Sequence, residues 1–493
     1  MRTISPCPIL HTDGKLCQSS TNCEKGKGRR MEDDQVENWS ENEFGDVALG
    51  DERRRKRLMQ LATALGKRPS GSLPQALGSY AALKAAYRFF ENPANEHQDM
   101  LKSHVQATYR RMAEMPLVLA IQDTTYLDWT HHPHTTGLGP TGVPYLLGAI
   151  MHSTLAITPE RVALGVLHEQ IWARDADTYA KLKDNSQRAI REKESIKWLI
   201  SLDSIIEAHN FLPDTHFVSV GDREADIYEL FAKERPIGVD LLVRATQNRC
   251  LDKDEHPTLW KALAARPLAA TFELQVPRTK KHPARIAQIE VRWKQVDLRP
   301  PNRPVGQKLP VVKVWAIWAN EPVPPEGEEA VEWMLLTTVA VTSTEEALER
   351  LEWYSCRWGI EIWHKILKSG CRIEARQLDD LEKLKRLLVL FSVVAWRILY
   401  SAMLARILPD TLCTIFFEPE EWQAAYCILH NTTILPQKEP TLREAVRMVA
   451  QLGGFLDRKG DGEPGVTVLW KGFQRLYDLT QMYKLLRPPD LRQ

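Results

Sequence analysis

The sequence lacks the features of membrane and secreted proteins. Its longest apolar run, Leu387 to Trp396, is far shorter than the roughly 20 residues of a membrane span, so we expect a buried helix there. No hydrophobic block precedes a small-residue cleavage site near the N-terminus, which argues against secretion. None of the cysteines forms a CxxC pair, and the spacing of Cys7, Cys17 and Cys23 matches no common zinc site. We therefore expect a cytoplasmic protein with reduced thiols and no membrane partner.

The sequence also lacks net charge, internal repeats and low-complexity tracts. Its 65 Lys and Arg residues nearly balance 64 Asp and Glu residues, so the formal net charge is only +1. Any binding of nucleic acid must therefore come from charge concentrated in one part of the chain. At 493 residues the chain is too long for one compact core, and its composition is that of a soluble globular protein. We expect two to four domains.

The N-terminal part divides into a flexible tail, residues 1–38, and a helical domain, residues 39–111. Leu58, Leu61 and Leu65 recur at helical spacing, and Gly66 is expected to end that helix. Residues 49–68 hold seven basic side chains against two acidic ones. That run is typical either of a solvated helix face or of a DNA-binding surface, and composition alone favours neither.

Strands alternate with helices in residues 112–375, which predicts an α/β sheet domain. Within it, residues 247–340 form a β-rich insertion with Pro-rich turns. Residues 278–313 carry ten Lys or Arg and two acids, which favours contact with a polyanion; a soluble β-ribbon with a basic outer face is the alternative. Residues 376–493 are predicted to be mostly helical.

Two carboxylates follow short apolar strands. Asp123 comes after Leu117 to Ile121, and Asp222 comes after the strand that ends at Val220. Carboxylates at the ends of neighbouring strands can converge on a divalent cation, and Mg²⁺ prefers such oxygen ligands. Aspartates after strands are also common turn or cap residues, and Asp128 and Asp226 compete for the same role.

A third group of polar residues falls in a long helix expected from Ser343 to about Gly370. Tyr354, Arg357, Glu361 and Lys368 share an arc about 60° wide and about 20 Å long in a regular helix. Glu361 can supply a third carboxylate, while the other three can hold phosphates. The simpler interpretation is a surface ion pair between Arg357 and Glu361 at i, i+4 spacing.

The pattern Tyr354-x2-Arg357-x3-Glu361-x6-Lys368 resembles the signature of the IS-four family of DDE cut-and-paste transposases, and most closely its Tn-five-like members. The motifs beginning at Asp123 and at Gly221-Asp222 resemble the positions of that family's two catalytic aspartates. The similarity extends from about Leu49 to the last helix. The resemblance implies an RNase H-like catalytic core with a β-strand insertion, an N-terminal helical domain that binds transposon ends, and a C-terminal helical dimerisation domain.

Carried over residue by residue, the resemblance implies a catalytic and metal-binding triad of Asp123, Asp222 and Glu361. It implies DNA contacts for a larger set of residues on several elements. These are Tyr354, Arg357, Lys368, Trp333, Arg244, Arg57, Lys67 and Arg88. Trp333 matches the tryptophan on which the family stacks a flipped base. The loop at Lys67-Arg68-Pro69 departs from the family's pattern.

The implied reaction is phosphoryl transfer with two Mg²⁺ ions about 3.5–4 Å apart, for which Mn²⁺ can substitute. The implied steps are nicking at the element end, formation and opening of a DNA hairpin, and strand transfer into target DNA. The implied partners are double-stranded transposon ends, target DNA and a second copy of the chain in a synaptic complex, in the nucleoid of a bacterium. Two alternatives stay open: a catalytically silent DNA-binding homologue or regulator, and a metal-dependent nuclease without strand transfer.

Overall fold

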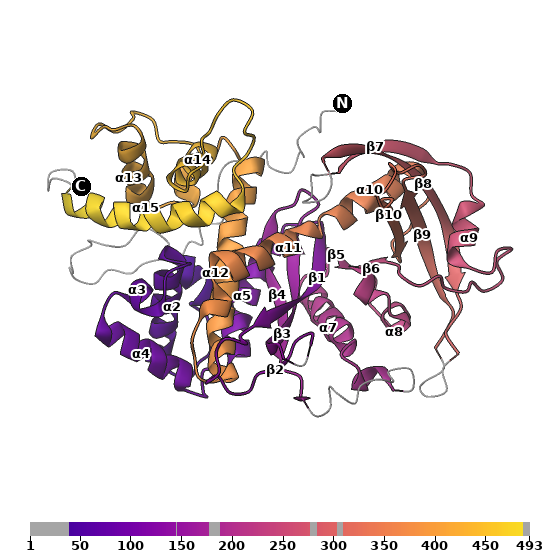
Figure 1. Ribbon diagram of the computed structural model, residues 1–493, viewed down its shortest axis with the longest axis horizontal. Helices are drawn as coiled ribbons and strands as arrows, with labels where there is room; N and C mark the ends of the chain where they lie inside the picture. The colour runs from indigo at the N-terminus through magenta and orange to yellow at the C-terminus, as the bar shows by residue number, and fades with distance from the viewer. Residues whose placement is uncertain (1–38, 144, 177–187, 277–282, 303–308, 487–493) are drawn as a thin grey trace, which may run out of the picture. The chain divides into compact units, whose positions relative to one another are not determined.

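The computed structural model describes residues 39–143, 145–176, 188–276, 283–302 and 309–486, whose path is shown in Figure 1. The predicted flexible tail, residues 1–38, lies outside the described residues, and so do its three cysteines. The five described cysteines, at positions 250, 356, 371, 413 and 427, are free thiols.

A mixed ten-stranded sheet forms the core of the fold (Figure 1). The strands are β1 (Leu117–Asp128), β2 (Gly139–Pro140), β3 (Leu147–Ile157), β4 (Ala163–Trp172), β5 (His216–Gly221), β6 (Val239–Arg244), β7 (Ala270–Val276), β8 (Arg285–Leu298), β9 (Val312–Asn320) and β10 (Glu332–Thr337). Their order is β2-β3-β1-β5-β6-β10-β9-β8-β7, with β4 paired to β3. β3 is antiparallel to β1 and to β4, whereas β5 runs parallel to β1 and β6 parallel to β5. The prediction of an α/β fold with a central sheet and helical flanks is confirmed.

Helices cover both faces of this sheet. They are α1 (Trp39–Phe44), α2 (Glu52–Lys67), α3 (Leu73–Leu77), α4 (Tyr80–Glu91), α5 (His97–Met112), α7 (Ile196–Phe211), α8 (Tyr228–Ala232), α9 (Leu259–Ala264), α10 (Thr344–Ser355), α11 (Trp358–Lys365), α12 (Leu381–Ile407), α13 (Pro419–Leu429), α14 (Leu442–Leu452) and α15 (Val466–Leu486). Alternate residues of β1 enter two cores: Leu119 and Ile121 pack with α12 residues, and Val118 and Ala120 pack with Trp198 of α7. Because β1 is buried on both faces here, its sequence from Leu117 to Ile121 is continuously apolar rather than alternating.

The long helix α12 connects the parts of the chain. Its apolar stretch from Leu387 to Trp396 is buried at every residue, as predicted. α12 is long and apolar enough to cross a membrane, but 83% of its most apolar window is buried inside the protein. It packs against α2 and α5, against β4, and against α14 and α15. Helices of the predicted N-terminal, catalytic and C-terminal segments therefore meet on one core helix.

The predicted insertion forms strands β7 to β10 and extends the central sheet, because β10 pairs antiparallel with β6. Basic positions 278, 280, 281, 303 and 308 lie outside the described residues. Four of the described basic side chains have acidic partners within 4 Å, and these four are Arg285, Arg292, Lys294 and Arg299. In the described part of the insertion, the paired charges favour the alternative of a soluble β-ribbon over a track for a polyanion.

The expectation that Gly66 ends the first basic helix is wrong. Helix α2 continues to Lys67, and its cap is Arg68. A Cβ atom at Gly66 would lie 2.6 Å from Cζ2 of Trp39. The glycine therefore serves close packing between α1 and α2 rather than termination.

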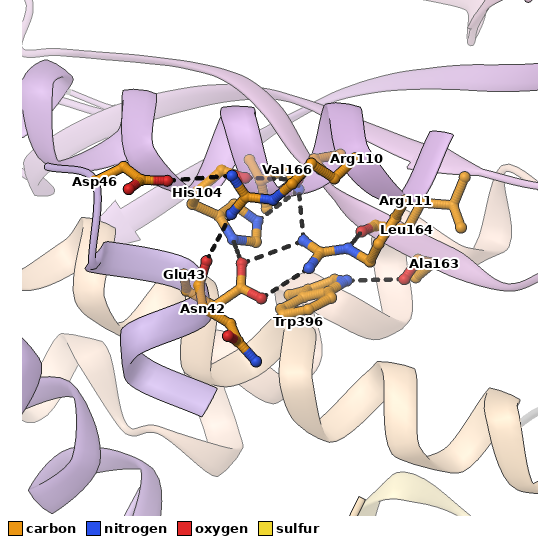
Figure 2. Close-up of polar contacts among 11 residues, drawn as sticks. Asn42, Glu43, Asp46, His104, Arg110, Arg111, Ala163, Leu164, Val166 and Trp396 are labelled. Atoms are coloured by element: carbon orange, nitrogen blue, oxygen red, sulfur yellow. Dashed lines mark hydrogen bonds and ion pairs between the residues drawn. The ribbon is translucent and has the colours of Figure 1, made fainter. Parts of the chain in front are cut away.

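A buried polar junction joins the N-terminal helices to the sheet and to α12 (Figure 2). Glu43 of α1 accepts hydrogen bonds from His104 Nδ1 at 2.6 Å and from Arg111 at 2.7 Å, both on α5. Arg111 also donates to the carbonyl of Leu164 on β4, and its guanidinium lies 4.3 Å from the centre of the Trp396 ring on α12. These contacts connect four elements from the three predicted domains in one cluster.

Candidate active site and DNA-contact residues

The pairing of β1 with β5 brings Asp123 and Asp222 together. Ile121 is opposite Val220 in this parallel pair, and each aspartate comes two residues after its member of the pair. Asp222 follows the end of β5 and accepts a hydrogen bond from the backbone N–H of Glu224 at 2.9 Å. The expectation that Asp123 also ends a strand is wrong, because β1 continues to Asp128 by pairing with β3.

Both aspartates have raised pKa values. Burial raises the pKa of Asp123 to about 7; the charges of Asp222 and Glu361 add to this, whereas Arg357 opposes it. Burial likewise raises the pKa of Asp222. Buried carboxyls whose charged forms repel one another are typical of sites that bind a cation or transfer protons.

Arg357 lies between the carboxylates in this structure. Its guanidinium is 4.0 Å from Oδ2 of Asp123 and forms an ion pair with Glu361 on the next turn. Among the described residues, no group of three His, Cys, Asp or Glu side chains is close enough to hold one metal ion. The three acids therefore surround a guanidinium rather than a shared cation position.

The predicted single helix from Ser343 to Gly370 is broken into three pieces, which is a second correction. Between α10 and α11 the N–H groups of Cys356 and Arg357 bond to carbonyls only three residues back. After α11, residues Ile366–Gly370 widen into a π-helix that closes with a bond from Cys371 N–H to the Ile366 carbonyl. The predicted arc assumed 100° per residue throughout, and tighter and wider turns violate that assumption.

Because of the wider turn, Lys368 has partners away from the carboxylates. Its ammonium donates to the backbone carbonyl of Tyr126 at 2.8 Å and pairs with Glu374 at 3.0 Å. Tyr126 lies three residues beyond Asp123 on β1, so Lys368 stands at the side of the site rather than over its centre.

Three other predicted DNA-contact residues gather next to Arg357. The rings of Trp333 and Tyr354 lie 5.9 Å apart at 60°, and Tyr354 is buried. Its hydroxyl has no hydrogen-bond partner that meets normal geometry among the described residues. Arg244, at the end of β6, donates to the carbonyl of Glu332, and burial lowers its pKa. The sheet pairing of β6, β10 and β9 thus brings an aromatic pair and two guanidiniums to one edge of the acidic centre.

Two histidines near Asp123 were not predicted. His364 is buried, and its Nδ1 lies 3.7 Å from Oδ2 of Asp123. Burial lowers its pKa to about 3, so the ring is neutral and the contact is not an ion pair. His152 on β3 hydrogen-bonds Thr124 at 2.9 Å and Gln122 at 3.2 Å, on either side of Asp123 in sequence. The i, i+3 spacing from Glu361 could have indicated His364, whereas only the β1–β3 register reveals His152.

The two competing aspartates have other roles. Asp226 accepts from the N–H groups of Thr246 and Gln247 and from Arg249, so its carboxylate is fully used inside the protein. Asp128 binds the backbone and hydroxyl of Thr130. The sequence offered four candidate aspartates. Only Asp123 and Asp222, the two in the predicted triad, have carboxylates that are not fully used by hydrogen bonds to nearby groups.

The three predicted end-binding residues lie on the N-terminal helices, away from this centre in the fold. Arg57 on α2 and Arg88 on α4 form no ion pair with any other described residue, and Arg88 is exposed. Lys67 instead places its ammonium 5.6 Å from the ring centre of Tyr477 on α15. Arg54 and Arg55 are engaged in contacts within the protein. The basic run on α2 therefore presents fewer free cations than its composition indicates.

Two family models match the chain at its two helical ends. Residues 36–95 match a model described as transposase DNA-binding. Residues 393–485 match a model described as transposase Tn5 dimerisation domain. These matches define a DNA-binding, dimerising protein of the transposase class. The resemblance inferred from the residue motifs is confirmed: both matches support a Tn5-like transposase.

Proposed function

We propose that this transposase cuts transposon ends and joins them to target DNA with Asp123, Asp222 and Glu361 as its catalytic, metal-binding carboxylates. The observation that carries the proposal is the register of β1 and β5, which sets two partly buried aspartates side by side and next to Arg357 and Glu361. The strand order β4-β3-β1-β5-β6, with an antiparallel first half and a parallel second half, supports an RNase H-like core.

The residues fit Mg²⁺ in chemical kind, since all three are carboxylates and two have raised pKa values. When bound, two Mg²⁺ ions would lower the pKa of an attacking hydroxyl and stabilise the leaving oxygen. Arg357 is placed to leave the carboxylates and bind a DNA phosphate instead, because its guanidinium matches phosphate geometry as well as carboxylate geometry. Its contact with Asp123 is long, at 4.0 Å, which favours such an exchange.

Trp333 supports a hairpin route. It is only partly buried at the edge of β10, and Tyr354 and Arg244 lie around it. A base flipped out of a sharply bent DNA end can stack on such a ring, and stacking of this kind contributes about 1–3 kcal/mol per base. Tyr354, Arg244 and Arg357 would bind the phosphates on either side of that base.

The test is a cleavage assay with labelled duplex DNA that carries the terminal sequence of the element, with and without Mg²⁺. The variants Asp123→Asn, Asp222→Asn and Glu361→Gln should each reduce nicking by several orders of magnitude and leave end binding within about threefold of wild type. Asp203→Asn is the matched control, since Asp203 is an exposed acid on α7. A triad variant that cleaves at the wild-type rate removes that residue from the assignment.

The same assay separates the alternatives. A silent homologue or regulator binds the ends and leaves them uncut at any Mg²⁺ or Mn²⁺ concentration. A nuclease without strand transfer cuts the ends but gives no joined product with a target duplex. We propose that the synaptic complex contains two copies of the chain and assembles on DNA in the bacterial cytoplasm, which size-exclusion chromatography with and without end DNA can test.

A further inference from the structure

A cavity of about 570 Å³ lies beside the proposed active site. It is lined on one side by Asp128, His131 and His132, which follow β1, and on the other by Lys368 and Arg372 with their neighbours. None of these residues belongs to the proposed triad.

The acids of this cavity are already engaged. Asp128 accepts hydrogen bonds from the backbone N–H and the hydroxyl of Thr130 at 2.9 and 2.6 Å. Glu374 pairs with Lys368 at 3.0 Å and also accepts from the backbone N–H of Asp128. In the described part of the chain, no three His, Cys, Asp or Glu side chains lie close enough together, here or elsewhere, to share one metal ion. The cavity is therefore poorly suited to a cation.

Its donors, by contrast, remain available. Arg372 is exposed and has no ion pair with a described residue, so its guanidinium is free to bind an anion. His131 is exposed at the rim, whereas Nδ1 of His132 is buried and has no hydrogen-bond partner within the described residues. One unpaired guanidinium and one exposed imidazole are therefore the groups that suit a phosphate oxygen.

The backbone at Arg372 has a conformation that is uncommon for a residue with a side chain. Its φ is +52°, in the left-handed region where glycine is favoured and where another residue carries a cost of roughly 1 kcal/mol. The adjoining π-helix ends at Gly370, so this bend follows directly from the irregular turn that carries Lys368.

The cavity lies further along β1 than Asp123, and the odd separation of Asp123 and Asp128 places their side chains on opposite faces of this strand. Asp123 and Asp128 are five residues apart on β1, which corresponds to about 17 Å at roughly 3.3 Å per residue. On the opposite side, the chain runs from Glu361 through Lys368 to Arg372. A nucleic-acid strand that leaves the carboxylates along β1 would reach the cavity about five base pairs away, at 3.4 Å per step.

We propose that this cavity binds a backbone phosphate of DNA leaving the active site, through Arg372 with His131. The proposal rests on the proposed function, because it takes the carboxylate centre as the place of cutting. The phosphate can belong to the DNA that flanks the element or to the target DNA, which share the same chemistry.

The test uses the full-length chain without divalent metal, so that no strand is cut, and measures affinity by fluorescence anisotropy. In the first arm, the labelled DNA is an element end that continues into its flanking sequence. In the second arm, a pre-cut element end is bound first, and a labelled target duplex is then added. In Arg372→Gly the guanidinium is lost while the left-handed backbone is relieved, so the melting temperature should not fall. The matched control is Lys253→Gly, which removes an exposed cation at φ +54° in a turn on the far side of the sheet, where the neighbouring Leu251 bridges to β8.

We expect Arg372→Gly to weaken one arm about tenfold and to reduce its salt slope by about 0.9, the value for one phosphate contact. Weaker binding in the first arm shows that the bound phosphate belongs to the flanking DNA. Weaker binding in the second arm shows that it belongs to the target DNA. A neutral methylphosphonate is placed at each of about six linkages beyond the cut, one linkage at a time. At one of these positions it should abolish the difference in affinity between variant and wild type. Wild-type affinity of Arg372→Gly in both arms, or an equal loss in Lys253→Gly, overturns the proposal. If the wild type itself does not bind element ends, the proposed function fails instead.

Discussion

The Arg357 guanidinium lies 4.0 Å from the Asp123 carboxylate while it forms an ion pair with Glu361. One positive charge thus compensates acids that come from a strand and a helix far apart in sequence. In the absence of metal, this arrangement reduces the repulsion among carboxylates whose burial is already costly.

Replacing Arg357 with glutamine should make the protein more dependent on Mg²⁺ for stability. Without the guanidinium, the opposing influence on the raised pKa of Asp123 is lost and the acids repel one another more strongly. We expect a lower melting temperature in EDTA and a Mg²⁺-induced stabilisation larger by about 1 kcal/mol than in wild type. Differential scanning fluorimetry with and without MgCl₂ measures both. The control is Arg161→Gln, whose exposed guanidinium binds Ser355 outside the acidic centre; a Mg²⁺ shift in Arg357→Gln equal to that control contradicts the prediction.

The Glu43 junction should make stability depend on acidic pH. Burial alone would raise the pKa of Glu43, but the His104 and Arg111 donors outweigh it and lower that pKa from 4.5 to about 2. Burial lowers the pKa of His104 as well, and this ring donates to Glu43 in its neutral form. A lowered carboxyl pKa stabilises the fold above pH 4.5, and that stabilisation, at most about 3 kcal/mol, is lost as the pH falls from 4.5 towards 2.

Urea unfolding of wild type and Glu43→Gln at pH 6 and pH 3 measures this contribution. The difference in unfolding free energy between the two proteins should be larger at pH 6 than at pH 3. Asp99→Asn is the control, because Asp99 forms only an exposed pair with Lys102 and should change stability by less than about 1 kcal/mol at both pH values. An equal wild-type-to-Glu43→Gln difference at the two pH values would falsify the role assigned to the junction.

The sequence predicted the strands and the long buried helix well because their signals are local. The strand predicted to end at Val220 is β5, which ends one residue later at Gly221. The register of strands was not predictable in this way, since it depends on contacts between segments far apart along the chain. For the same reason His152 was missed although it lies opposite Thr124.

The errors arose where helical periodicity was extended through irregular turns. The sequence around Arg357 gives no indication of hydrogen bonds to carbonyls three residues back. The π-turn at Lys368 adds a residue, which rotates the Lys368 side chain away from the predicted arc. Gly66 was predicted as a helix end because glycine often has that role, whereas here it makes room for Trp39. In each case tertiary packing decided the local geometry.

Trp333→Ala should impair hairpin formation more than the first nick. Stacking of a flipped base on this ring would offset part of the unstacking cost, so hairpin yield should fall about tenfold or more while nicking stays within about threefold. Denaturing gels that resolve nicked, hairpin and opened products measure the steps separately. Trp333→Phe, which keeps an aromatic face against Tyr354, should retain most of the hairpin yield. Equal loss at both steps in Trp333→Ala indicates a packing defect rather than loss of base stacking.

Arg57→Ala and Arg88→Ala should weaken binding to the element ends. Neither side chain has an ion pair among the described residues, so each is available to a DNA phosphate or base edge. Each substitution should lower affinity about tenfold, and a phosphate contact should also reduce the salt slope by about 0.9. Arg55→Ala is the matched control on α2, since Arg55 is held by Glu52 and the carbonyl of Gly45 and should matter less for DNA. Electrophoretic mobility shifts with end and random duplexes distinguish the two kinds of contact. If Arg57→Ala weakens binding to random DNA only, the N-terminal domain does not read the end sequence, because a base-specific contact must affect the cognate end more strongly.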